Sequence, residues 1–263
     1  MNIIVCIKQV PGTSNVKVDP VTGVLIRDGV ESKMNPYDLS ALELGLKLRE
    51  KNGGSLRVVS MGPPPAAAVL KEAIYMGADS GVLVSDRKFG GADVLATSYT
   101  LAQAIASMGG CDLILTGKQT TDGDTAQVGA ELAEFLGIPH FSNVLELEAA
   151  GDGRVRYKAN LDNKLITATV PTPCVMCAEA EINTPRLPSY RRKKEFDTEE
   201  LIAIFSLADF ADKDELHYGL NGSPTQVERI FPPEKNTDKK VLEGDGETLA
   251  ENLFVILKEK KFI

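Results

Sequence analysis

The sequence is poor in the residues that hydrolytic sites and metal centres usually need. It has two histidines, His140 and His217, and four cysteines among 263 residues. Neither histidine has the spacing of a Ser/His/Asp or Cys/His set, which argues against nucleophilic catalysis of those types. Cys174 and Cys177 form one C-x-x-C motif. No second such motif or nearby histidine accompanies it, and it falls on a predicted strand, where residues three apart face opposite sides. The sequence therefore predicts neither a metal site nor catalytic residues.

Long apolar runs and an excess of basic residues are also missing. No uninterrupted apolar stretch approaches the length of a membrane span. The formal net charge of −8 argues against nucleic acid or an anionic membrane as the main partner. The N-terminus has no basic start and no small-residue cleavage site, so residues 1–8 indicate a first strand and not a signal peptide. We therefore expect a cytoplasmic protein with reduced cysteines.

What the first 140 residues do have is an alternation of short apolar strands and amphipathic helices. Strands are predicted at residues 3–7, 56–60, 82–84 and 113–116. Helices are predicted between them, one starting at Asn35-Pro36, an N-cap residue followed by proline. This pattern predicts an α/β fold with a parallel sheet and helices on both faces. Ligands of such sheets bind at the carboxyl ends of the strands, so the loops after Ile7, Ser60 and Thr116 should converge.

The pattern changes in two places. Residues 16–27 alternate around a Pro/Gly turn, which predicts a surface hairpin. From about residue 141, the segments 144–147, 155–159 and 165–170 predict a small antiparallel sheet. The last forty or so residues are polar and end in an amphipathic helix with Leu249, Leu253, Ile256 and Leu257 on one face. We predict a domain over residues 1–200 and, over residues 201–263, a C-terminal arm. That arm folds back on its own domain or reaches a partner subunit, and its long polar approach favours the partner.

Residues 117–129 (GKQTTDGDTAQVG) lead from a predicted strand into a predicted helix. Such a turn points backbone N–H groups at the positive end of the helix dipole, which suits phosphate. We expect Gly123 to allow close approach of a ligand and Asp124 or Thr125 to cap the helix. An ordinary capped loop is the alternative. The dinucleotide motif G-x-G-x-x-G and the P-loop are both missing. Any chemistry would then belong to a bound cofactor.

Several stretches together resemble the beta subunit of electron-transfer flavoproteins, in the family's order and over most of the chain. They are residues 4–11 (IVCIKQVP), 34–38 (MNPYD), 76–79 (MGAD), 117–129, 136–139 (LGIP) and 183–186 (NTPR). The resemblance implies a Rossmann-like domain that binds an adenine nucleotide. It also implies that the C-terminal arm embraces an alpha subunit, which carries FAD.

The resemblance assigns the nucleotide site residue by residue. The implied contacts are Cys6, Asn35, Pro36, Tyr37, Asp38, Met61, Gln119, Thr120, Thr121, Asp122, Gly123, Asp124, Thr125, Ala126, Gln127, Val128 and Gly129. Cys6 and Met61 are equally compatible with ordinary core positions.

The family has two branches, which differ in the nucleotide of the beta subunit. One holds AMP as a structural ligand. The other holds a second FAD that takes hydride from NADH and bifurcates the electrons, one to ferredoxin or flavodoxin and one through the alpha-subunit FAD to a partner dehydrogenase. Residues 90–99 and 220–227 resemble the bifurcating branch, with contacts expected from Asp93, Thr97, Ser223 and Thr225.

Residues 186–200 depart from the family's Lys-rich docking loop, because the basic run Arg191–Lys194 is followed by acidic residues. Tyr190 stands where an apolar anchor is expected. This departure argues against an acyl-CoA type of partner dehydrogenase, and a lactate type of flavoprotein dehydrogenase is the alternative.

Overall fold

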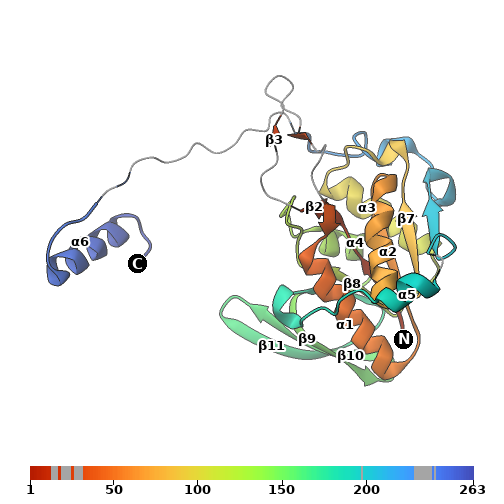
Figure 1. The fold of residues 1–263 in the computed structure, drawn as a ribbon, viewed down its shortest axis with the longest axis horizontal. Helices are drawn as coiled ribbons and strands as arrows, with labels where there is room; N and C mark the ends of the chain where they lie inside the picture. The colour runs from red at the N-terminus through yellow and green to blue at the C-terminus, as the bar shows by residue number, and fades with distance from the viewer. Residues whose placement is uncertain (13–16, 19–24, 27–31, 197, 228–238, 240) are drawn as a thin grey trace. The chain divides into compact units, whose positions relative to one another are not determined.

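The computed structural model describes residues 1–12, 17–18, 25–26, 32–196, 198–227, 239 and 241–263 (Figure 1). The chain forms two compact units, Met1–Glu228 and Arg229–Ile263. The first unit contains the large sheet and its covering helices.

The first unit is built on a nine-stranded sheet in the order β11-β10-β9-β12-β8-β1-β6-β7-β13. From β9 to β13 each neighbouring pair runs parallel, whereas β10 and β11 are antiparallel at one edge. The strands are β1 (Asn2–Cys6), β6 (Ser55–Met61), β7 (Ser80–Val84), β8 (Leu113–Gly117), β9 (His140–Gly151), β10 (Arg154–Leu161), β11 (Lys164–Pro171), β12 (Cys174–Ala178) and β13 (Ile202–Phe205).

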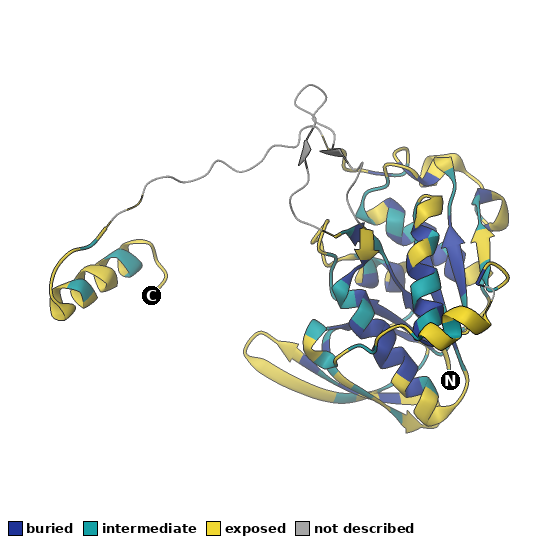
Figure 2. Ribbon diagram, in the orientation of Figure 1, coloured by how far each residue is buried: buried dark blue, intermediate teal, exposed yellow. Residues whose placement is uncertain are grey.

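Helices cover both faces of the parallel strands. Helices α1 (Pro36–Asn52) and α2 (Ala67–Met76) share one buried cluster with Ile3 and Val5 of β1. Helices α3 (Val94–Ser107) and α4 (Val128–Leu136) share the other with Ile4. Successive side chains of a strand point to opposite faces, which is why β1 is buried on both (Figure 2). The predicted α/β fold with a helix-covered parallel sheet is confirmed.

The antiparallel elements are smaller. Strands β2 (Gln9–Pro11) and β5 (Ser32–Met34) form a two-stranded antiparallel sheet. In the hairpin predicted over residues 16–27, β3 (Lys17–Val18) pairs with β4 (Leu25–Ile26), and its turn lies outside the described residues. The antiparallel strands predicted between residues 144 and 170 are β9 to β11. They continue the main sheet, because β9 pairs with β12.

The predicted domain boundary at residue 200 falls inside the first compact unit. Strand β13 adds to the sheet beside β7, and Leu207, Phe210 and Tyr218 are buried against α3 and β7 residues. The buried apolar surface therefore joins residues 201–227 to the sheet. Over its described residues, the first unit also has a short α-helix, α5 (Tyr190–Glu195), and five short 3-10 helices. These are η1 (Pro64–Ala66), η2 (Arg87–Phe89), η3 (Ala180–Ile182), η4 (Leu207–Asp209) and η5 (Glu215–His217).

In the described residues of the second unit, the chain forms helix α6 (Gly246–Glu259). Asp245 caps it by accepting a hydrogen bond from the Thr248 N–H at 2.9 Å. No residue of α6 is buried, and Leu253, Phe254 and Val255 are exposed. Across the described part of the chain, no helix combines the length and apolar character needed to cross a membrane.

Candidate functional site

The strand order changes direction at β1. The chain passes from β1 to β6 and β7 on one side, then crosses to β8 on the other. Cys6, Met61 and Gly117 end these three neighbouring strands at one edge of the sheet. Cys6 is buried, and Met61 packs half-buried against the α3/α4 cluster. This edge is the position at which open α/β sheets bind ligands.

Asp38 ties two of these strand ends together. Its carboxylate accepts hydrogen bonds from the backbone N–H of Lys8 at 2.8 Å and of Gly117 at 3.1 Å. Burial raises the pKa of Asp38 to about 7, although hydrogen bonds from Asn35, Lys8 and Gly117 oppose the rise. At Gly117 a Cβ atom would lie 2.5 Å from the Asp38 Oδ1, so this approach requires glycine. Asp38 thus fixes the start of the loop that follows β8.

Asn35 holds the next part of that loop. The helix predicted at Asn35-Pro36 is confirmed as α1, but the Asn35 side chain makes no capping bond. Its amide nitrogen donates to the Gln119 carbonyl at 2.8 Å, and its oxygen accepts from the Thr121 N–H at 3.3 Å. The side chain is fully buried, whereas Pro36 and Tyr37 are half-buried. The buried Asn35 side chain therefore holds the backbone of this loop at Gln119 and Thr121.

Residues 118–127, here called the cradle loop, connect β8 to α4. Helix α4 begins at Val128 with Gln127 as its N-cap residue and has no side-chain cap. The expectation that Asp124 or Thr125 caps α4 was wrong, because Asp124 and Ala126 adopt left-handed φ values of 52° and 55° and delay the helix. The Asp124 carboxylate instead accepts from Gln119 Nε2 at 2.5 Å. Left-handed backbone thus occurs beside Gly123 and not at it.

The backbone N–H groups at the end of this loop have no acceptor in the part of the chain that the structure describes. Within the described residues, none of the five N–H groups of residues 125–129 donates a hydrogen bond. Residues 121–127 are all exposed, and Val128 and Gly129 form the first turn of α4. Unpaired N–H groups at a helix start, together with the helix dipole, favour an anion. This arrangement fits a phosphate group.

Lys8 belongs to the same site, although sequence reasoning missed it. Its Nζ contacts both carboxylate oxygens of Asp122, at 2.8 Å and 2.7 Å. Burial raises the pKa of Asp122, but the hydrogen bond and charge of Lys8 outweigh it and hold the pKa below its ordinary value. The available signal was the place of Lys8, two residues beyond the strand end at Cys6. Its partner lies 114 residues away in sequence, which no local pattern reveals.

The second predicted group of contacts lies at the start of α3. Asp93 caps α3 by accepting from the Ala96 N–H at 3.0 Å, and it also accepts from the Thr225 hydroxyl at 2.7 Å. The Ser223 hydroxyl accepts from the Asp93 N–H at 2.8 Å. Thr97 is half-buried one turn into α3, and its N–H donates to the Asp93 carbonyl. The structure brings Asp93, Ser223 and Thr225 together, and they bond to one another.

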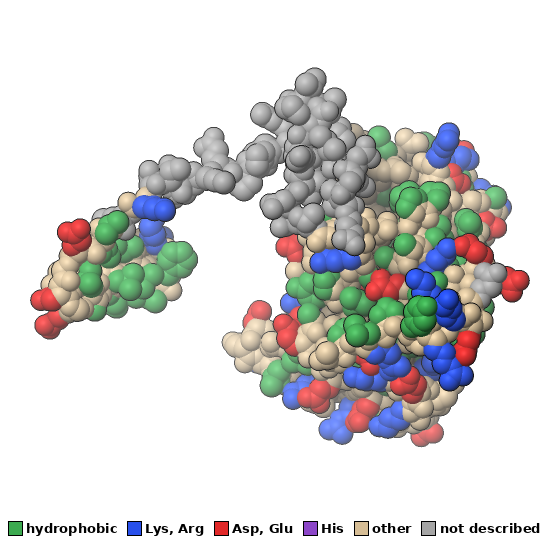
Figure 3. Space-filling view, in the orientation of Figure 1, with side chains coloured by type: hydrophobic (Ala, Val, Ile, Leu, Met, Phe, Trp, Pro, Cys, Tyr) green, Lys and Arg blue, Asp and Glu red, His purple; other side chains and the backbone are tan. Residues whose placement is uncertain are grey.

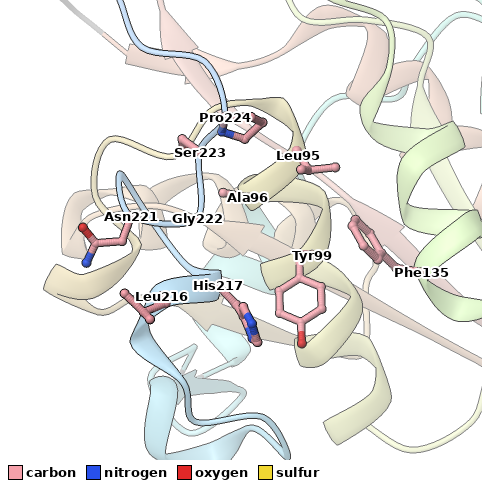
Figure 4. A pocket seen from close by; sticks show the side chains of 10 residues that line it. All are labelled: Leu95, Ala96, Tyr99, Phe135, Leu216, His217, Asn221, Gly222, Ser223 and Pro224. Carbon is pink, nitrogen blue, oxygen red and sulfur yellow. The ribbon is translucent and has the colours of Figure 1, made fainter.

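A pocket of about 470 Å³ opens beside Ser223, between α3, α4 and residues 216–224 (Figure 4). Its walls are mostly apolar and aromatic, with the Tyr99 and Phe135 rings 5.2 Å apart. Asp212 accepts hydrogen bonds from the Tyr99 hydroxyl and from His217 Nδ1, both at 2.5 Å. These bonds hold the pKa of Asp212 at about 2. Three separate segments line the pocket, and no local pattern in the chain shows that they meet.

Comparison with known proteins identifies the family. The sequence profile of the electron transfer flavoprotein domain matches residues 22–203. The electron transfer flavoprotein subunit beta of Clostridium acetobutylicum is 43% identical over 263 residues, covering all of both chains. The caffeyl-CoA reductase-Etf complex subunit CarD of Acetobacterium woodii is 41% identical, again over all of both chains. Protein FixA of Azorhizobium caulinodans is 38% identical, covering 94% of this chain and 90% of that protein. The chain therefore belongs to the electron transfer flavoprotein family, in its beta-subunit group.

Proposed function

We propose that this chain is the beta subunit of an electron-bifurcating flavoprotein and holds FAD at the start of α4. Bound flavin would supply the chemistry, accepting hydride from NADH and passing single electrons to ferredoxin or flavodoxin and, through the FAD of an alpha subunit, to a dehydrogenase. The side chains of this protein bind and orient that cofactor. We expect the complex to work in the cytoplasm.

The observation that carries the proposal is the row of unpaired N–H groups over residues 125–129. A nucleotide phosphate supplies the acceptors that this row lacks, at the positive end of the α4 dipole. Asn35 and Asp38 keep the row in place, since they bond to the cradle loop and to the Gly117 N–H. Neither residue needs to touch the ligand for this role.

The choice of FAD over AMP is supported by the region around α3. Ser223 and Thr225 hydrogen-bond to Asp93, and the aromatic pocket lies beside them. Apolar and aromatic walls with few polar groups suit a planar ring system, which FAD has beyond its adenosine part. CarD is named as a subunit of a caffeyl-CoA reductase-Etf complex. AMP is the second candidate, because the row of N–H groups can donate hydrogen bonds to its phosphate equally well.

Identifying and quantifying the nucleotides bound to the purified heterodimer tests the proposal. After acid denaturation we expect two FAD per heterodimer, and one FAD from the isolated alpha subunit as the control. One FAD and one AMP per heterodimer would support the second candidate. A heterodimer with no adenine nucleotide beyond the alpha-subunit FAD would contradict both.

Residues 186–200 are proposed to contact the partner dehydrogenase. Two arginines fix this segment: Arg186 pairs with Glu43 and Glu50 of α1, and Arg192 donates to the carbonyls of Ile74 and Ala78 at the end of α2. Leu187 and Tyr190 lie between these anchors and are 87% and 71% exposed. Figure 3 shows hydrophobic and basic side chains side by side on this face. Exposed apolar side chains on a fixed segment indicate a docking surface.

Alanine substitutions test this surface. Leu187→Ala and Tyr190→Ala should each weaken the complex with the dehydrogenase by about 1–3 kcal/mol, while NADH oxidation with an artificial dye stays unchanged. Leu165→Ala, which removes a 63% exposed side chain from β11, is the matched control. The altered charge pattern after Lys194 favours a lactate-type partner. Efficient coupling to an acyl-CoA dehydrogenase would contradict that preference, and no loss in either variant would contradict the docking surface.

Helix α6 is proposed to bind the alpha subunit, since none of its residues is buried and its side chains Leu253, Phe254 and Val255 are exposed. Deleting residues 239–263 should abolish heterodimer formation in gel filtration. The circular dichroism of the first unit should persist, because its core contains no residue from this segment. Heterodimers of full stability after the deletion would contradict this role.

A further inference from the structure

The cradle loop contains carboxylates where an anion is expected to bind. Asp122 and Asp124 both lie in the exposed part of the loop. A phosphate approaching the α4 N-terminus meets their negative charge, which opposes binding. Asp124 is engaged by the neutral amide of Gln119, whereas Asp122 has a cationic partner in Lys8.

The backbone of Lys8 is fixed independently of this ion pair. Its N–H donates to Asp38 Oδ2 at 2.8 Å, and its carbonyl accepts from the Asn35 N–H at 2.9 Å. The side chain therefore starts from a constrained point at the end of β1 and reaches the cradle loop. The loop's own lysine, Lys118, pairs with Glu179 at 2.9 Å. Among the described residues, Lys8 is the cation that contacts Asp122.

We propose that Lys8 is a positioning residue of the cradle, which neutralises Asp122 and thereby lets the α4 N-terminus accept a nucleotide phosphate. This inference rests on the proposed function, since it assumes that a phosphate binds there. It makes a distinct claim, namely that Lys8 acts through Asp122 and not by touching the ligand. A direct contact between Lys8 and the phosphate is the competing explanation.

A double-mutant cycle separates the two explanations. The dissociation constants of FAD and of AMP are measured for heterodimers stripped of the beta-subunit nucleotide, with wild type, Lys8→Met, Asp122→Asn and the double variant. Neutralisation predicts that Lys8→Met weakens binding at least about tenfold, because an uncompensated carboxylate then faces the phosphate. Asp122→Asn should bind at least as tightly as wild type. The double variant should return to within about threefold of wild type, since nothing remains to be neutralised.

Salt gives a second readout. At about 1 M salt the Debye length is about 3 Å, so the deficit of Lys8→Met should shrink to about threefold or less. Lys158→Met, which removes a cation paired with Glu146 at 2.9 Å on the antiparallel strands, controls for loss of a surface ion pair and should bind like wild type. Urea midpoints of all variants show whether they are folded.

Two results would overturn the inference while leaving the proposed function intact. A double variant as weak as Lys8→Met means that Lys8 contacts the phosphate directly. A Lys8→Met variant within about threefold of wild type at low salt means that the charge of Asp122 does not matter. By contrast, a wild-type heterodimer that binds neither FAD nor AMP in the beta subunit would overturn the proposed function and this inference together.

Discussion

Helices α3 and α4 lie on the same face of the sheet and follow two strands that are consecutive in the chain, β7 and β8. The backbone N–H groups at their starts are nevertheless bonded differently. At α3, Asp93 caps the first turn and is itself bound by Thr225, while Ser223 accepts from the Asp93 N–H. At α4, Gln127 provides no side-chain cap, and the N–H groups of residues 125–129 find no acceptor within the described residues. The N-terminus of α3 is therefore capped by the Asp93 carboxylate, which we call a closed helix start. The N-terminus of α4 has no such cap, and we call it an open helix start.

This difference shows that polar residues at a helix start do not by themselves make a ligand site. Asp93, Ser223 and Thr225 have the residue types of a phosphate site, but their bonds are made internally. The α4 start has the unmet donors, and so it has the stronger tendency to bind an anion. The residues near α3 instead hold Ser223 and Thr225 against the start of that helix.

The largest expected effect is on stability: the contributions of Asp38 and Asp93 to the free energy of unfolding should depend on pH in opposite directions. The pKa of Asp38 is raised to about 7 by burial, while hydrogen bonds from Thr225, Ala96 and Leu95 outweigh desolvation and lower the pKa of Asp93. Folded Asp38 holds a proton that the unfolded chain has lost above about pH 4. Its contribution to stability is therefore complete below about pH 4 and lost as pH rises through about 7, at up to about 1.4 kcal/mol per pH unit.

Urea unfolding from pH 4 to 8 checks this contribution, with Asp38→Asn as the variant that cannot titrate. The free energy of unfolding of wild type should fall relative to that of Asp38→Asn as pH rises. Asp93→Asn should show the opposite sign, since a lowered pKa stabilises above the unfolded pKa and the benefit is lost in acid. Parallel pH profiles for wild type and Asp38→Asn would contradict the raised pKa.

A glycine keeps the open helix start in place. A Cβ atom at Gly129 would lie 2.3 Å from Cys177 Sγ and 3.1 Å from Thr116 Oγ1. Gly129→Ala should therefore push α4 away from β12 and lower the free energy of unfolding by about 1–3 kcal/mol. At Gly123 the same atom would lie 3.4 Å from Thr120 Oγ1, an ordinary contact, so Gly123→Ala is the matched control. Equal midpoints in urea for the two variants would contradict the close packing.

A carboxylate placed at the N-terminus of α4 should interact with its unpaired N–H groups, as the Asp93 carboxylate does at α3. Gln127→Glu adds a carboxylate at the positive end of α4 with little change in side-chain size. It should weaken FAD or AMP binding by about tenfold and stabilise the helix by a few tenths of a kcal/mol. Gln127→Ala, which removes the side chain without adding charge, should bind as wild type does. Equal affinities for Gln127→Glu and Gln127→Ala, measured by equilibrium dialysis, would place the phosphate elsewhere.

The smallest effect is expected from removing the side-chain cap of α3. Asp93→Ala removes the cap of α3 and the acceptor of Thr225, and should cost about 1 kcal/mol of stability. Hydrogen exchange at the Thr225 amide should accelerate, because its acceptor at 3.0 Å is lost. Gln127→Ala should leave stability nearly unchanged, because no capping bond exists to lose. Similar losses in both variants would remove the distinction between the two helix starts.

Much of the fold follows from local patterns in the chain. The alternation of apolar strands and amphipathic helices predicted the parallel sheet, and Asn35-Pro36 predicted the start of α1. The segment from Gly117 to Gly129 predicted where strand, loop and helix meet. The strand β13 was missed because Ile202–Phe205 is a short run without a following helix pattern, and it is recognised only by its pairing with β7.

The sequence by itself therefore determined which elements form and at which edge of the sheet their loops gather, because period and turn chemistry act between near neighbours. Only the tertiary structure decided which helix start stays open. That outcome depends on Thr225 reaching Asp93 across 132 residues, on Asn35 reaching Gln119 across 84, and on Lys8 reaching Asp122 across 114. Such contacts exist only after the sheet has brought distant segments together, since no local preference specifies which polar group will meet which.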